Sequence, residues 1–247
     1  MSSKRRTGTS LPRRRSSRAS SPPTSAQHRG ISRRQLFSVA GIAVLGTAGV
    51  IAAGNLLRED DGSVPVSRSA DIPTTERVKG IAAAPVTIVE YADLQCPVCA
   101  RFSRTIEPQI ETAFIAPGVA KLEFRHFAFL GKESLRAAAA CECAAEQGAF
   151  FTYRDALYAA QSGENRGAFN DDALRRIASE IGLDTRAFDD ALASGRHAGT
   201  VTRQTAEGQA MGVKATPTFI INGTKLEGLA SFDTYRRVIE QAAGSAS

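Results

Sequence analysis

Two cysteines separated by two residues, Cys96 and Cys99, follow a short apolar run at residues 86–91. This run contains β-branched residues and predicts a buried strand, whereas the apolar spacing after the cysteines predicts a helix. The pair, with Pro97 and Val98 between the two thiols, is therefore expected at a strand-to-helix junction. Two thiols one helical turn apart can form and break a disulfide, so the pattern predicts disulfide exchange with other thiols.

The two thiols are predicted to differ in acidity. Cys96 begins the helix, where unpaired backbone N–H groups and the helix dipole favour an anion, so its pKa should lie below the value of about 8.5 of a free cysteine. Cys99 lies one turn later on the same face and should be more buried and less acidic. Cys96 is therefore predicted to be the attacking sulfur and Cys99 the resolving sulfur.

A structural zinc half-site is the alternative interpretation of this pair. A site with four thiolates would need Cys141 and Cys143, the other two cysteines of the chain. Residues two positions apart on a helix point about 200° away from each other, so these two are poorly placed to bind one metal ion. The pattern favours redox chemistry without a metal. Cys141 and Cys143 are not expected to bond to each other, and at least one is expected to be a buried free thiol.

The basic residues are concentrated at the N-terminus. Residues 1–34 contain ten of the 31 Lys and Arg residues and none of the 25 acidic residues. The rest of the chain is therefore net acidic, and the overall formal charge of +6 is no evidence for nucleic-acid binding. Because residues 1–34 also contain little apolar surface, we expect them to be disordered.

A candidate export signal follows this basic segment. The twin arginine Arg33-Arg34 precedes residues 35–57, of which 38–57 carry no charge. This order resembles a twin-arginine export signal. A plain membrane anchor at 38–57 is the alternative, because about 20 apolar residues cross a bilayer, and cleavage of the signal stays open. In both cases the positive-inside rule places the rest of the chain outside the cytoplasm, where disulfides persist.

The remaining sequence predicts a linker and one domain. Residues 58–80 are polar and contain two prolines, which is typical of a linker. Residues 81–247 combine β-branched runs with helical patterns and indicate the α/β class. Helical character is continuous over about residues 130–212, and Asn222-Gly223 predicts the turn of a hairpin before a C-terminal helix.

Four separated segments carry a resemblance to a known family. They are Val-Glu-Tyr-Ala-Asp-Leu-Gln-Cys-Pro-Val-Cys-Ala-Arg-Phe at 89–102, Phe-Arg-His-Phe at 124–127, Cys-Ala-Ala-Glu-Gln-Gly at 143–148 and Thr-Pro-Thr-Phe-Ile-Ile-Asn-Gly at 216–223. In this order they resemble the DsbA-like thiol-disulfide oxidoreductases. The resemblance implies a thioredoxin-like fold with an inserted all-helical domain.

The resemblance also implies roles for residues around the thiols. Pro217 is expected to form a cis peptide bond and to lie against the sulfurs, as part of the catalytic set. Thr216 would then offer backbone hydrogen bonds to an extended substrate, with Pro97 and Val98 as neighbouring substrate-binding residues.

Glu90 is the remaining candidate catalytic residue. It lies six residues before Cys96, where this family carries an acidic residue beneath the active site. A buried carboxyl with a raised pKa could there transfer a proton to and from Cys99. A strand-end glutamate that faces water is the alternative, and the sequence leaves the choice open.

These features together predict an exported, monomeric enzyme that transfers the Cys96–Cys99 disulfide to cysteine pairs of exported proteins. The resemblance implies reoxidation by a quinone-linked membrane partner, of the DsbB or vitamin K epoxide reductase type, and no dissociable cofactor. A reductase or isomerase is an alternative, because Pro97-Val98 differs from the dipeptides of the best-known oxidants. Alternatives from other classes are a non-catalytic peptide-binding module that uses the Thr216-Pro217 edge, and a metal carrier.

Overall fold

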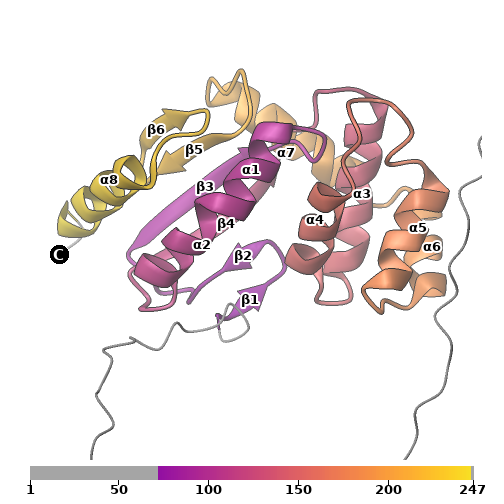
Figure 1. Cartoon of the computed structure of the whole chain (residues 1–247), viewed down its shortest axis with the longest axis horizontal. Coiled ribbons are helices and arrows are strands. Elements are labelled where there is room, and N and C mark those ends of the chain that lie inside the picture. The colour runs from indigo at the N-terminus through magenta and orange to yellow at the C-terminus, as the bar shows by residue number, and fades with distance from the viewer. Residues whose placement is uncertain (1–71, 246–247) are drawn as a thin grey trace, which may run out of the picture. The chain divides into compact units, whose positions relative to one another are not determined.

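The computed structural model describes residues 72–245, in which helices pack around a six-stranded sheet (Figure 1). The predicted disordered segment 1–34 and the signal or anchor at 35–57 lie outside the described residues, as does most of the predicted linker. Within 72–245, every helix is too short or too polar to cross a membrane.

The sheet has the strand order β1-β2-β4-β3-β5-β6. β3 and β4 are parallel, and every other neighbouring pair is antiparallel. β3 is the strand before the two thiols, and it pairs with β4 and β5 on its two sides. The strands are β1 (Thr74–Thr75), β2 (Val78–Lys79), β3 (Val86–Ala92), β4 (Ala120–His126), β5 (Thr218–Ile221) and β6 (Thr224–Glu227).

The first two strands fall within residues 58–80, which the sequence predicts to be a linker. β1 and β2 form an antiparallel hairpin, and Val78 pairs with Glu123 of β4. The folded domain therefore begins before residue 81, earlier than predicted. Each strand has two residues, which is too few to show an alternating pattern, and the buried residue is Lys79, a type that is mostly exposed.

Helices cover both faces of the sheet (Figure 1). One face carries α1 (Pro97–Thr105), α2 (Glu107–Ile110), the π-helical turn Glu111–Ile115 and the C-terminal α8 (Phe232–Ser245), which share one apolar core with β3 and β5. The other face carries α7 (Ala198–Ala210), which packs on β4. Side chains alternate between faces along a strand, so Glu90 faces the α1 side together with Ile88.

The helical block predicted over about 130–212 lies between β4 and β5. Its core is continuous with the first turn of α1, since Cys99 and Ala100 belong to the same apolar cluster as Leu157 and Tyr158 of α4. The Asn170 side chain accepts a hydrogen bond from the Ala173 amide and caps α5. The helices before α7 are α3 (Lys132–Ala145), α4 (Phe150–Ala159), α5 (Asp171–Glu180) and α6 (Thr185–Ser194).

Candidate redox site

The two thiols lie where β3 ends and α1 begins. Cys96 is the N-cap residue of α1, and Pro97 occupies the first turn, where a missing N–H leaves no helical hydrogen bond unmade. Cys96 retains 6% exposure, whereas Cys99 is fully buried at 0%. Both are free thiols in this structure. Cys96 is therefore the less deeply buried of the two cysteines.

The two thiols differ in acidity in the predicted direction. The pKa of Cys96 is lowered from 9.0 to about 6, although burial acts to raise it. The largest cause is a hydrogen bond from the Cys99 thiol, and hydrogen bonds from Thr216 and from backbone N–H groups add smaller effects. Burial, and then the hydrogen bond and charge of Cys96, raise the pKa of Cys99 well above 9.0. The negative charge of the pair therefore rests on Cys96 at neutral pH.

The Thr216–Pro217 peptide bond is cis, as the resemblance implies. The Cys96 Sγ atom lies 3.4 Å from the Thr216 carbonyl oxygen, so the downstream segment and the thiols meet in space. Pro217 is buried, and Thr216 is half-buried. Pro97 is exposed and Val98 is half-buried beside Cys96. Pro217 and the three residues expected to contact substrate thus lie close to Cys96 in the structure.

Glu90 is buried beneath this pair with 1% exposure, so of the two interpretations the buried carboxyl is confirmed. Neither of its carboxyl oxygens has a hydrogen-bond partner among the described residues. The pKa of Glu90 is raised from 4.5 to about 8, first by burial and second by repulsion from Glu107. The positive charges of Arg154 and Lys79 lower it by a smaller amount. Glu90 is therefore a neutral carboxylic acid at pH 7, within electrostatic range of Cys99.

A buried ionic cluster beside Glu90 was not foreseen from the sequence. Glu107 accepts hydrogen bonds from Lys79 Nζ at 2.7 Å and from Arg154 Nη2 at 2.8 Å, and Lys79 also contacts Glu111. These two cations already have carboxylate partners, and their attraction lowers the pKa of Glu90 by less than burial and repulsion from Glu107 raise it. The cluster joins β2, α2 and α4, which are far apart in the sequence, and no local pattern marks it.

Asp93 fixes the loop that leads to Cys96. Its carboxylate accepts hydrogen bonds from the Gln95 amide at 2.8 Å, the Ser134 hydroxyl at 2.6 Å and the Phe129 amide at 2.9 Å. The Cys96 amide donates to the Asp93 carbonyl at 3.0 Å. An aspartate directly after a strand is typical of turns, but its distant partners, Phe129 and Ser134, could not be predicted from the sequence.

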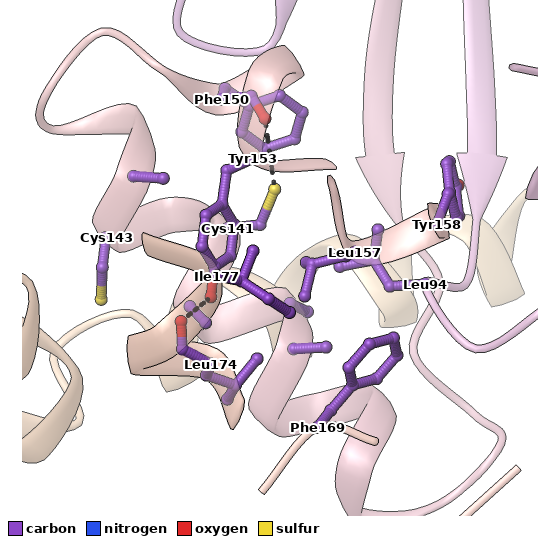
Figure 2. Packing of buried hydrophobic residues seen from close by; sticks show 14 of the residues in the cluster. Leu94, Cys141, Cys143, Phe150, Tyr153, Leu157, Tyr158, Phe169, Leu174 and Ile177 are labelled. Atoms are coloured by element: carbon purple, nitrogen blue, oxygen red, sulfur yellow. Dashed lines mark hydrogen bonds between the residues drawn. The ribbon is translucent and has the colours of Figure 1, made fainter. Parts of the chain in front are cut away.

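Cys141 and Cys143 are both buried and free, as expected. Figure 2 shows the Cys141 sulfur directed at the Phe150 carbonyl, 3.6 Å away, and the Cys143 side chain on a different side of α3. Burial raises the pKa of Cys143 to about 11. Within residues 72–245, no three His, Cys, Asp or Glu side chains are grouped so as to bind a metal ion.

Known proteins resemble this chain in sequence and in fold. The sequence model of the thioredoxin family matches residues 73–241. The chain belongs to the thioredoxin family. Among solved structures, the oxidised form of BdbD from Bacillus subtilis superposes with a TM-score of 0.64 and 28% identity, covering 68% of this chain and 92% of BdbD. The α-DsbA1 of Wolbachia pipientis gives a TM-score of 0.62 and 25% identity, covering 72% of this chain and 96% of that protein.

Two curated proteins show sequence similarity to this chain. Disulfide bond formation protein D of Bacillus subtilis is 29% identical over 161 residues, which cover 64% of this chain and 72% of that protein. The Na(+)/H(+) antiporter NhaA 3 of Salinispora tropica is 33% identical over 193 residues, or 77% of this chain, but this chain spans 28% of the antiporter's length. The protein is thus a DsbA-like member of the thioredoxin family, whose fold carries an inserted helical domain.

Proposed function

We propose that the protein donates the Cys96–Cys99 disulfide to pairs of cysteines in exported proteins. The observation that carries this proposal is the unequal pair: Cys96 keeps 6% exposure and has a pKa lowered to about 6, whereas Cys99 is fully buried and has a raised pKa. Stabilising the Cys96 thiolate stabilises the reduced protein relative to the disulfide. A pair that favours its reduced form is an oxidant of other thiols.

The reaction begins when a substrate thiolate attacks the Cys96 sulfur of the disulfide. The Cys96–Cys99 bond breaks, Cys99 leaves with the electron pair, and the substrate becomes joined to Cys96 in a mixed disulfide. A second substrate thiolate then attacks the substrate sulfur of this bond and expels Cys96 as a thiolate. The substrate is oxidised by two electrons, and the Cys96–Cys99 pair is reduced.

Glu90 supplies the proton that the first step needs. Cys99 leaves as a buried thiolate whose pKa is well above 9, so it takes a proton from any neutral acid in reach. Glu90 is such an acid, because its pKa of about 8 keeps the carboxyl protonated at neutral pH. The same carboxylate can take the proton back when the disulfide is formed again.

Thr216, Pro97 and Val98 are proposed to hold the substrate chain. The Thr216 segment before the cis bond is partly open beside Cys96, and a peptide could pair with its backbone as an added strand. A quinone-linked membrane protein of the DsbB or vitamin K epoxide reductase type would then restore the disulfide. We place this cycle outside the cytoplasm, with residues 35–57 as the export signal or anchor.

The test uses the oxidised protein and a reduced, unfolded protein with two cysteines. Wild type should convert the substrate thiols to a disulfide in stoichiometric amounts, and Cys96→Ser should oxidise none. Reduced Cys99→Ser, mixed instead with the oxidised form of the substrate, should form a mixed disulfide at Cys96 as the Cys96 thiolate attacks the substrate disulfide and expels one substrate thiolate. Undiminished thiol oxidation by Cys96→Ser would refute the proposal. A peptide-binding module predicts instead that Cys96→Ser keeps its function, and a metal carrier predicts metal equimolar with the purified protein.

A further inference from the structure

Tyr158 carries a buried hydroxyl that has no hydrogen-bond partner among residues 72–245. The side chain is 3% exposed, so water is not an evident partner either. The two other deeply buried tyrosines differ: Tyr153 donates to the Leu174 carbonyl at 2.9 Å, and the Tyr235 hydroxyl contacts the Gly228 carbonyl at 3.4 Å. Buried tyrosine hydroxyls usually find a partner, because an unpaired one costs desolvation energy. A phenylalanine at position 158 would avoid that cost.

Two contacts define how α4, which carries Tyr158, lies along α1. Near the C-terminal end of α1, the Ser103 hydroxyl is 3.2 Å from the Asp155 carboxylate. At the other end, Gln161 Nε2 donates to the Cys96 carbonyl at 3.2 Å. Residue numbers increase along α4 in the direction in which they decrease along α1, so the two helices are antiparallel where they meet.

This register places Tyr158 opposite Cys99. Cys99 lies four residues before Ser103, and Tyr158 lies three residues after Asp155, which is one helical turn in each case. Both side chains belong to one buried cluster. Figure 2 shows Tyr158 near Leu94, at the far end of α4 from Phe150.

The surroundings of Tyr158 indicate which titratable groups lie near its hydroxyl. Burial raises the pKa of Tyr158 most, followed by negative charge on Cys99 and on Glu90; Arg154 lowers this pKa, and Glu107 raises it by a smaller amount. The Arg154 guanidinium carbon is 5.9 Å from the centre of the Tyr158 ring. These are the titratable groups that face the hydroxyl from α1, α2, α4 and β3, and at pH 7 the tyrosine remains a neutral O–H donor.

We propose that the Tyr158 hydroxyl donates a hydrogen bond to the Cys99 sulfur as this sulfur leaves the Cys96–Cys99 disulfide. The inference deepens the proposed function and depends on it for its role in the enzyme's cycle. A hydrogen bond to an ionised group is stronger than one between neutral groups, so this bond strengthens as negative charge develops on the leaving sulfur. Tyr158 keeps its own proton throughout, and Glu90 supplies the proton that finally protonates Cys99.

The experiment compares Tyr158→Phe with Tyr153→Phe, which removes a satisfied hydroxyl from the same helix. The full chain is oxidised, and the rate at which dithiothreitol opens its disulfide is followed between pH 6 and 9. Tyr158→Phe should be slowed about tenfold, which corresponds to about 1.4 kcal/mol in the barrier. Tyr153→Phe should stay within about twofold of wild type across the same pH range.

Three further readouts separate this role from a structural one. The pKa of Cys96, followed by thiolate absorbance, should not change in Tyr158→Phe. The reduction potential should move by less than about 30 mV, because Cys99 is a neutral thiol in the final reduced state. Unfolding in urea should show Tyr158→Phe to be as stable as wild type or more so, since no hydrogen bond of the folded protein is lost.

The inference is overturned if Tyr158→Phe opens its disulfide within twofold of the wild-type rate, or if Tyr153→Phe is slowed equally. It is also overturned if Tyr158→Phe loses as much stability as Tyr153→Phe, because the hydroxyl would then have a structural partner. These results do not depend on the proposed function: dithiothreitol opens the disulfide whether or not the protein oxidises exported proteins.

Discussion

The low pKa of Cys96 depends first on the hydrogen bond that it receives from the Cys99 thiol, and this dependence can be tested by substitution. Cys99→Ala removes the donor, whereas Cys99→Ser keeps a hydroxyl in the same place as a matched control. Neither variant can form the disulfide, so the acidity of Cys96 can be titrated without interference from oxidation. The expected result is a raised pKa in the alanine variant and a nearly unchanged one in the serine variant.

The size of this effect follows from the strength of one hydrogen bond to an anion. Such a bond contributes about 1.5–3 kcal/mol, and one pKa unit corresponds to about 1.4 kcal/mol. The pKa of Cys96, about 6 in the wild type, should therefore rise by about one to two units in Cys99→Ala. The fraction of thiolate at pH 7 would fall from about nine-tenths to about half or less.

The assay is the absorbance of the thiolate at about 240 nm, recorded as the pH is varied. The rate of alkylation by iodoacetamide is a second measure. Cys141 and Cys143 contribute little below pH 8, because burial raises the pKa of both. A pKa of Cys96 that stays at about 6 in Cys99→Ala would refute the reasoning. The helix terminus and Thr216 would then be sufficient to stabilise the thiolate.

Three further predictions concern Glu90, the ionic cluster beside it and the packing of α7. Glu90 keeps its proton up to about pH 8 in the folded protein but releases it near pH 4.5 in the unfolded chain, so wild type loses stability as the pH rises through this interval. In urea unfolding, the stability of Glu90→Gln relative to wild type should therefore increase by a few kcal/mol between pH 4 and pH 8.5. A stability difference that stays constant with pH would contradict this. Lys79→Met leaves two buried carboxylates short of a cation and should cost about 3–5 kcal/mol by the same method; a cost below about 1 kcal/mol would show that the cluster is solvated. Gly208→Ala adds a methyl group 2.8 Å from Phe127 and should lower stability by about 1–3 kcal/mol. Gly199→Ala in the same helix meets nothing within 4 Å, and should stabilise by about 0.5–1 kcal/mol.

The redox pair was predictable because its signals are local. Cys96 and Pro97 carry the features of a helix start within two residues, and the structure places both there. Asn222-Gly223 likewise specifies its turn without help from the rest of the chain, and β5 and β6 flank it as expected. The cis bond before Pro217 came from the family resemblance and not from the local sequence.

The features that the sequence did not reveal depend on distant partners. Lys79 is buried only because Glu107, 28 residues away, accepts its hydrogen bond, so in the sequence it looks like part of a polar linker. Glu90 was equally compatible with water and with burial until the packing of α1 and α4 was known. Tyr158 has the spacing of any core tyrosine, and its distinction from Tyr153 appears only when the partner of each hydroxyl is identified.

The most direct test of the central claim is the reduction potential of the Cys96–Cys99 pair, measured by equilibration of the full chain with glutathione. If the Cys96 thiolate stabilises the reduced protein as the structure indicates, the potential should lie closer to about −120 mV than to about −270 mV. A value near about −270 mV would mean that the disulfide is the favoured state. The protein would then reduce the disulfides of its partners, and the direction proposed for the transfer would be wrong.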